Sequence, residues 1–428
     1  MTSTERTISP PEPGLTAEQI IARAEALQPK LVGRQAETEE RTYYSEETHH
    51  EFVNAGFYRM LVPRRYGGYE FDLPTFLRTV MAISRGCPST GWCLCLASAH
   101  ALQVASLFGE RAQAELFGEG DFRCAAVAAP AGVATPVEDG WELNSTHPYS
   151  SGAPYSTHYM GQTFTPGPDP DGPPGPILLF VAKRGMWTML DDWGDTLGLK
   201  GSGSHSLRFD RARIPAHWAL ENTWMVDTDV SGGTPGHRLH GNPMYAGRTL
   251  SFFQAELAAI MVGSAKGAVD EYEAIMRARK TQRPPIVPRY LDPDYQRWFG
   301  LAMGRVAAAE AAVVQCAEQY MELCRRSVED GVPFSREDDL RLNIVAREAG
   351  TLAWDAMQGQ IFRTAGTSAA KAGQRIERIF RDLAMCWGHF GTIVGDWAAR
   401  ELAKEHLGLV TDGPPRPDQE HVVRREGA

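Results

Sequence analysis

The stretch Asn144-Ser-Thr-His-Pro-Tyr-Ser-Ser-Gly152 lies about a third of the way along the chain, where an alternating segment runs through a proline into two serines and a glycine. Short apolar or alternating runs, bounded by Gly, Pro, Asp and Asn, occur on both sides of it and are typical of β-strands. The candidate strands are 122–129, 140–147, 157–165, 177–183, 187–192 and 205–212. The Gly/Pro-rich segment 166–176 predicts an exposed hairpin loop, because it cannot continue a strand. The sequence therefore predicts a β unit around this stretch.

Helical patterns flank the β unit. Residues from Leu15 to about Leu107 are mostly of helical pattern, with a turn-rich break at Pro63-Arg-Arg-Tyr-Gly-Gly68. After the β unit, apolar residues recur at three- and four-residue steps in the segments 250–276, 295–328, 335–364 and 376–406. Four long amphipathic helices joined by short breaks predict a four-helix bundle.

We therefore expect an α+β protein with an N-terminal helical domain, a central β-barrel or sandwich and a C-terminal four-helix bundle. The predicted divisions are a flexible tail (1–14), the helical domain (15–118), the β domain (119–230), the bundle (231–410) and a polar tail (411–428).

Composition narrows the functional classes. The chain has 43 Lys and Arg against 53 Asp and Glu, a net charge of −10, which disfavours nucleic acid and anionic membranes as partners. The first residues lack an apolar signal segment, and apolar runs such as 177–182 are too short to span a membrane, so we expect a cytoplasmic protein. Its 7 cysteines lack the spacing of a disulfide framework or a zinc site, and we expect reduced thiols and no metal.

Nucleotide-binding motifs are not evident. No Walker A sequence is present, and the glycines of Gly198-Leu-Lys-Gly-Ser-Gly203 follow no strand that opens into a helix. We therefore expect no nicotinamide site of the Rossmann type.

The order of units resembles the acyl-CoA dehydrogenase superfold, and three motifs carry this resemblance over nearly the whole chain. Residues 61–68 resemble the helix-breaking P-x-x-Y-G-G segment of that family. Residues 144–152 match the strand whose hydroxyl residue contacts flavin N5, and 198–215 match the glycine-rich loop and strand that follow. Residues 378–382 resemble the Arg-Asp signature near the start of the last helix.

The chain departs from the dehydrogenases at their catalytic base. Where those enzymes carry a glutamate before Gly-Thr, this sequence has Phe390, and at the alternative position it has Gly247. A phenyl ring cannot abstract a proton. His389 stands beside Phe390, and this region, together with Trp92 and His100, resembles the oxygenase components of two-component flavin monooxygenases, such as the hydroxyphenylacetate and secosteroid phenol hydroxylases.

This resemblance implies an enzyme that receives reduced FMN or FAD from a separate NAD(P)H-dependent flavin reductase. In such relatives, a C4a-hydroperoxide formed with O₂ transfers one oxygen atom to an aromatic or electron-rich small molecule, and members are commonly homotetramers. The alternatives are an acyl-CoA dehydrogenase with a displaced base, a non-catalytic flavin carrier, and oxygenation at nitrogen or sulfur instead of carbon.

The resemblance also implies roles for individual residues. Ser151 is expected to hydrogen-bond flavin N5, and His389 to act on the substrate as a base or hydrogen-bond partner. His100 is expected to face the flavin or the phenol, although a histidine on an apolar helix can equally be a core residue. The expected cofactor-binding residues are Ser151, Trp92, Ser202, Ser204 and Arg279, the last through flavin phosphates across a subunit interface. Arg381 and Asp382 are read as structural residues that fix the last helix.

Overall fold

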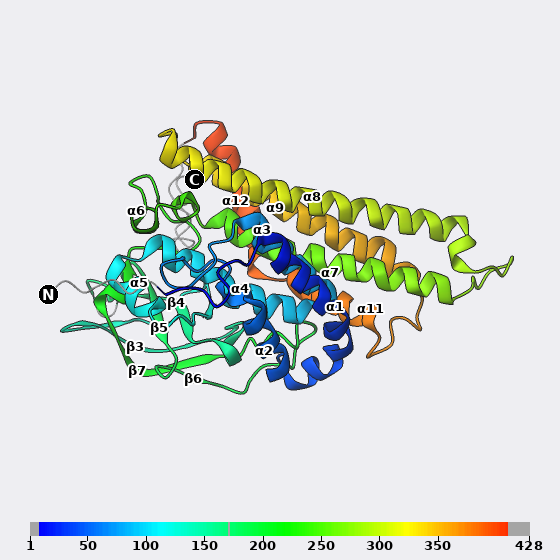
Figure 1. Ribbon diagram of the computed structural model, residues 1–428, viewed down its shortest axis with the longest axis horizontal. Coiled ribbons are helices and arrows are strands. Elements are labelled where there is room, and N and C mark those ends of the chain that lie inside the picture. Colours follow the sequence, from blue (N-terminus) through cyan, green and yellow to red (C-terminus); the bar gives the residue numbers. More distant parts are fainter. Residues whose placement is uncertain (1–7, 170–171, 410–428) are drawn as a thin grey trace, which may run out of the picture.

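The computed structural model describes residues 8–169 and 172–409 (Figure 1). The predicted polar tail 411–428 lies outside these residues, as do residues 1–7 of the predicted tail 1–14. Within the predicted tail 1–14, Ile8 forms a β-bridge with Tyr66, so this part of the chain is attached to the helical domain.

From residue 8 onward, the described part of the N-terminal region contains the α-helices α1 (Ala17–Arg41), α2 (Glu46–Ala55), α3 (Leu73–Gly86), α4 (Pro88–Leu107) and α5 (Glu110–Phe117). Thr16 caps α1 in a capping box with Gln19, which satisfies backbone N–H groups at the helix start. The turn at 63–68 needs its glycine, since a Cβ on Gly68 would lie 1.8 Å from the Val62 carbonyl oxygen. Helix α4 is buried on nearly all sides, which explains why its sequence is apolar all round.

The described residues of the β unit form two four-stranded sheets. The first has the order β1 (Cys124–Ala126), β4 (His158–Phe164), β5 (Ile177–Lys183) and β8 (Ala219–Glu221), with β1 parallel to β4. The second has the order β2 (Thr135–Val137), β3 (Gly140–His147), β7 (Leu207–Pro215) and β6 (Thr188–Met189).

The core of the β unit lies between the two sheets. Tyr159 and Phe180 from the first sheet meet His147 and Phe209 from the second, with ring centroids 5.3 to 6.0 Å apart. The described strands form no closed barrel, so the predicted barrel or sandwich is a two-sheet unit. The segment 166–176 connects β4 and β5 at the hairpin where the sequence places it.

The C-terminal helices are α7 (Leu250–Ala278), α8 (Pro293–Glu329), α9 (Arg336–Asp355), α11 (Arg375–Trp387) and α12 (Phe390–His406). The short helices α6 (Pro235–His240) and α10 (Arg363–Ala365) connect them to their neighbours. Helices α7, α8 and α9 pack side by side along the long axis of the molecule (Figure 1). Helix α4 lies between the β unit and α7.

Two predicted helices differ from those observed. The segment 335–364 leaves α-helical geometry after Asp355 and continues as a π-helical turn, Ala356–Phe362. The segment 376–406 is two helices, because the chain breaks at Gly388 and His389. Gly388 and His389 at this second break line the cavity that is described below.

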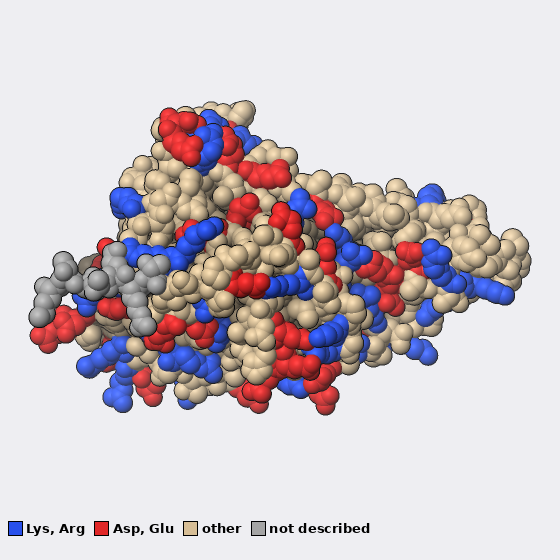
Figure 2. Space-filling model, in the orientation of Figure 1, with Lys and Arg blue, Asp and Glu red and all other residues tan. Residues whose placement is uncertain are grey.

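Helix α8 is apolar and long enough, by length and composition, to cross a membrane, and 28% of its most apolar window is buried. One side of it packs on α7 and α9, which accounts for part of its apolar character. Basic and acidic side chains are interspersed over the face shown in Figure 2 and do not gather into one basic patch there.

Candidate active site

A cavity of about 390 Å³ lies where α4, the β unit and the first turns of α7 meet the break between α11 and α12. Apolar side chains make up most of its wall, including Leu96, Phe253, Leu257 and Val394. No described group of three His, Cys, Asp or Glu side chains could hold a metal ion. The polar residues of the wall therefore stand out against apolar surroundings.

A hydrogen-bonded chain of side chains runs along one side of the cavity. The indole N–H of Trp92 donates to Ser151 Oγ at 2.9 Å, Ser151 Oγ lies 2.8 Å from Ser204 Oγ, and Ser204 Oγ lies 2.6 Å from Ser202 Oγ. Trp92, Ser151 and Ser204 line the cavity, whereas Ser202 lies behind Ser204. Because an indole can only donate, Ser151 keeps its own proton and one lone pair for Ser204 and for a bound molecule.

The loop between β3 and β4 brings Ser151 to this position. Tyr149 and Gly152 both adopt left-handed backbone conformations, with φ of 61° and 79°. A Cβ on Gly152 would lie 3.1 Å from the carbonyl oxygen of Cys93 on α4, so glycine permits the loop to approach that helix closely. The backbone N–H of Gly152 also donates to the Ser202 carbonyl at 3.1 Å, which couples the two serine loops.

His100 lies on α4, two turns after Trp92, and lines the same cavity. Its Nδ1 lies 2.7 Å from the carbonyl oxygen of Cys124, which can only accept a hydrogen bond. Nδ1 therefore carries the proton, and Nε2 of the neutral ring is an acceptor. Burial lowers the pKa of His100 to about 4, so the ring is neutral at pH 7.

His389 lies at the N-cap of α12, in the break after α11, and not inside a helix. Its Nδ1 accepts the backbone N–H of Gly391 at 3.1 Å, which leaves the proton of the neutral ring on Nε2. Burial lowers the pKa of His389 to about 4. The ring stands edge-on to Trp92 at 5.1 Å and lines the cavity. The two histidines thus have opposite tautomers.

Arg279 does not line the cavity. It caps the far end of α7, where its Nη1 donates to Ser368 Oγ at 2.5 Å. At ~1.5 Å rise per residue, the helix carries it roughly 30 Å from Leu257 in the cavity wall. Contact between Arg279 and the cavity of its own chain is therefore excluded, and only a site shared between copies could use it for the flavin.

The structure confirms that neither dehydrogenase position holds a base. Phe390 lines the cavity, and a Cβ on Gly247 would lie 2.1 Å from the Tyr320 hydroxyl, which leaves no room for a longer side chain. The cavity does contain one carboxyl group that the sequence analysis overlooked, Glu256 on α7. The available signal was an acidic residue within an apolar helical run.

The Arg-Asp pair supports the wall. Asp382 Oδ1 accepts the backbone N–H of Leu199 at 2.6 Å, and Ser89 donates to Oδ2 at 3.2 Å. A Cβ on Gly198 would lie 2.0 Å from the Arg381 carbonyl oxygen. These contacts hold the loop that carries Ser202 and Ser204 against α11, in agreement with the structural reading of the pair.

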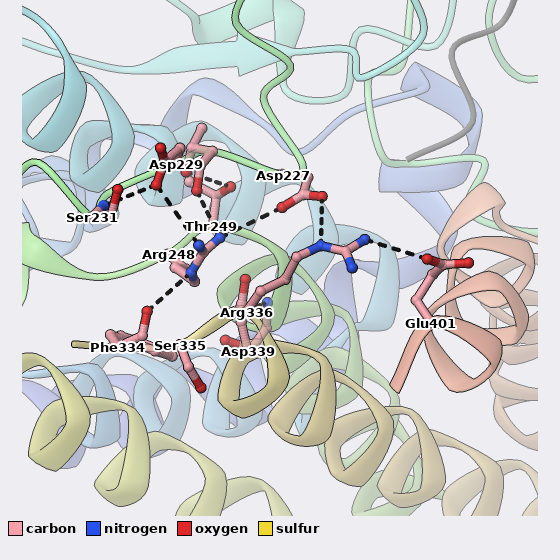
Figure 3. Close-up of polar contacts among 12 residues, drawn as sticks. Asp227, Asp229, Ser231, Arg248, Thr249, Phe334, Ser335, Arg336, Asp339 and Glu401 are labelled. Carbon is pink, nitrogen blue, oxygen red and sulfur yellow. Dashed lines mark hydrogen bonds and ion pairs between the residues drawn. The ribbon is translucent and has the colours of Figure 1, made fainter. Parts of the chain in front are cut away.

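A buried ion network holds other cavity-lining segments together (Figure 3). Arg248 lies 3.6 Å from Asp227, and Arg336 lies 3.3 Å from Asp227 and 3.7 Å from Glu401. Asp227 follows Val226 of the wall, and Arg248 precedes α7. Arg336 and Glu401 belong to α9 and α12. The network therefore connects the β unit to three helices around the cavity.

Comparisons with known proteins agree with this architecture. Models of the acyl-CoA dehydrogenase N-terminal and C-terminal domains match residues 17–118 and 255–393, together more than half of the chain. A pigment production hydroxylase of Rhodococcus sp. is 28% identical over 94% of this chain and 99% of its own.

Two further relatives carry more specific names. The oxygenase subunit HsaA, a flavin-dependent monooxygenase of Rhodococcus jostii, is 26% identical over 85% of this chain and 91% of its own. XiaF from Streptomyces sp., solved in complex with FADH2 and glycerol, has a TM-score of 0.82 at 20% identity and covers 93% of this chain and 97% of its own. The chain belongs to the acyl-CoA dehydrogenase family, in the group whose named members are oxygenase components of flavin-dependent monooxygenases.

Proposed function

We propose that this protein is the oxygenase component of a two-component monooxygenase. It takes reduced FMN or FAD from a separate NAD(P)H-dependent flavin reductase and uses O₂ to oxygenate an aromatic or electron-rich small molecule. The observation that carries this proposal is the Trp92–Ser151–Ser204 chain in the wall of an apolar cavity that lacks a base at both dehydrogenase positions.

The cavity suits a flavin ring. Its apolar wall and flanking indoles, Trp92 and Trp193, match the faces of a flat aromatic ring, and Ser151 and Ser204 offer hydroxyls to a polar edge. A bound reduced flavin supplies two electrons to O₂ and so makes one oxygen atom available to the substrate. Ser151 would hold a proton or a lone pair toward the flavin N5 edge, and the largely apolar wall would limit the access of water.

His100 is proposed to receive the hydroxyl group of the substrate. With a pKa of about 4, against ~10 for a phenol, the histidine does not remove the phenolic proton in the ground state. Its Nε2 accepts the hydrogen bond instead, which increases electron density on the ring as oxygen is transferred.

His389 is proposed as a hydrogen-bond donor through Nε2. The base role expected for it from the sequence does not fit a ring whose Nδ1 already accepts the Gly391 N–H. A neutral donor beside Trp92 can stabilise negative charge that develops on oxygen next to the flavin.

The proposed cellular location and oligomeric state rest on the family to which the chain belongs. We propose a cytoplasmic homotetramer, and the apolar side chains Leu301 and Met303, each 49% exposed on α8, support a contact between copies. In such an assembly Arg279 is available to flavin phosphates of a neighbouring copy.

The test uses purified protein, a flavin reductase, NADH, FAD or FMN and heavy-isotope-labelled O₂, with a panel of phenols that includes 4-hydroxyacetophenone. We expect a product with one labelled oxygen atom, formed only when flavin is reduced. If no phenol gains label and all the electrons appear as hydrogen peroxide, the proposal is wrong.

The dehydrogenase alternative should also be tested, because Glu256 is a carboxyl group in the cavity and a dehydrogenase needs a carboxylate base. Burial raises the pKa of Glu256 well above its ordinary 4.5, which favours the protonated acid over the carboxylate that a base requires. We therefore expect no bleaching of oxidised flavin when butyryl-CoA is added without oxygen.

A further inference from the structure

Glu256 is a buried carboxyl group with unused hydrogen-bonding capacity. Only 1% of the residue is exposed, and it lines the cavity from α7. Among the described residues, its Oε1 has no hydrogen-bond partner, and the one hydrogen bond to Oε2 comes from the thiol of Cys95, at 3.7 Å. In the part of the chain that the structure describes, no Lys, Arg or His pairs with it.

Such a carboxyl group is stable here only as the neutral acid. Removing an unpaired carboxylate from water costs far more than burying the protonated form, so burial raises the pKa of Glu256. Burial also raises the pKa of the Cys95 thiol, which therefore keeps its proton and donates a hydrogen bond to Oε2. The acid proton then belongs on Oε1, the oxygen without a partner.

A buried donor without an acceptor is costly, and a bound molecule that supplies the acceptor removes this cost. None of the cavity groups discussed above accepts this proton, since Oε1 of Glu256 has no hydrogen-bond partner among the described residues.

Resting on the proposed function, we infer that Glu256 anchors the substrate by donating a hydrogen bond from its carboxylic acid to a carbonyl oxygen. The substrate class is then an aromatic ketone, quinone or amide, and not merely a phenol. Glu256 thereby selects among aromatic molecules that the apolar wall alone would accept with little discrimination.

The alternative hypothesis is that the substrate is a cationic amine that pairs with ionised Glu256. Two substitutions of Glu256 distinguish the hypotheses. Glu256→Gln keeps the shape and a donor but can never carry a negative charge, whereas Glu256→Leu keeps the approximate volume and removes the donor. A leucine replaces a group that has no strong partner, so we expect this variant to fold.

Three phenols of similar size serve as probes: 4-hydroxyacetophenone carries a carbonyl, 4-isopropylphenol replaces it by an apolar group, and tyramine carries an amine. Their dissociation constants are measured by calorimetry on protein that holds reduced flavin, without oxygen. For the wild type we expect the ketone to bind about tenfold more tightly than 4-isopropylphenol. Glu256→Gln should keep most of this preference, and Glu256→Leu should abolish it.

Infrared spectroscopy reads the carboxyl group directly. Spectra are taken at a pH above the pKa values of two buried aspartates, about 6 for Asp339 and about 7 for Asp382, so that these two are ionised. We expect a carbonyl stretching band of a protonated acid that shifts when the ketone binds. Glu256→Gln should remove it, and Asp339→Asn, a buried carboxyl outside the cavity, should not.

The inference is wrong if the wild type does not prefer the ketone, if Glu256→Leu keeps the preference, or if tyramine binds most tightly and only the wild type binds it. It is also wrong if the protonated-acid band is absent. None of these measurements uses oxygen, so they can succeed even if the oxygenase proposal fails, and the isotope experiment can succeed if the carbonyl anchor fails.

Discussion

Replacing Ser151 by alanine breaks the hydrogen-bonded chain at its centre. The variant deprives Trp92 of the acceptor at 2.9 Å and Ser204 of the partner at 2.8 Å. A buried indole N–H without a partner costs about 1–3 kcal/mol, so we expect the free energy of unfolding to fall by that amount. The same change removes one hydrogen bond at the flavin edge, worth about 1–2 kcal/mol, which corresponds to roughly 5- to 30-fold more hydrogen peroxide per product.

The assay measures product and hydrogen peroxide formed per reduced flavin in a single turnover. The chain offers a graded control, because the Ser204 hydroxyl contacts Ser151 directly, whereas the Ser202 hydroxyl hydrogen-bonds Ser204 and not Ser151. We expect peroxide release to rise most in Ser151→Ala, less in Ser204→Ala and least in Ser202→Ala. Unchanged coupling in Ser151→Ala, or equal loss in all three variants, would refute the reasoning.

The remaining predictions concern the histidines, the supporting aspartate and pH. His100→Phe keeps the packing but removes the hydrogen-bond acceptor. It should lower the product yield in single turnovers about tenfold or more, while the dissociation constant for reduced flavin changes little. A large loss of flavin affinity would contradict the role assigned to His100. His389→Asn keeps an acceptor at the N-cap of α12, whereas His389→Ala removes it. Urea denaturation should therefore show a free energy of unfolding about 1 kcal/mol lower for the alanine variant only, while both variants lose product. Equal stability of the two variants would argue against the capping role. Asp382→Ala leaves the Leu199 N–H unpaired and should lower the free energy of unfolding by about 1–3 kcal/mol in the same assay, with Asp382→Asn closer to wild type. The pKa values of His100 and His389 are lowered to about 4, so both rings stay neutral until the pH approaches that value. We therefore expect the single-turnover yield to show no transition near the usual histidine pKa of 6.5 and to fall only at lower pH. A transition near 6.5 that disappears in His100→Phe would contradict this.

Local sequence signals sufficed for much of the fold. Strands 140–147 and 177–183 match the observed β3 and β5, because their alternating or apolar runs end at Gly, Pro and charged residues. The three-residue strands β2 and β8 were missed, because they owe their geometry to pairing with β3 and β5 and not to a pattern of their own.

The site was less accessible to sequence reasoning. The break at Gly388 and His389 lies within an apolar periodicity that continues on both sides, so the pattern predicted one helix. The tautomers of His100 and His389 depend on backbone groups brought near by the fold, Cys124 for His100 and Gly391 for His389. The burial of Glu256 likewise depends on α4 packing against α7, which no local pattern encodes.

The most direct test of the central claim is the fate of reduced flavin when oxygen is admitted. Protein and reduced flavin are mixed without oxygen, an oxygen pulse follows, and the flavin absorption spectrum is recorded over time. We predict that the bound flavin returns to its oxidised spectrum far more slowly than free reduced flavin, and that Ser151→Ala shortens this delay. Reoxidation at the rate of free flavin, together with bleaching of oxidised flavin by butyryl-CoA, would contradict the account and favour a dehydrogenase.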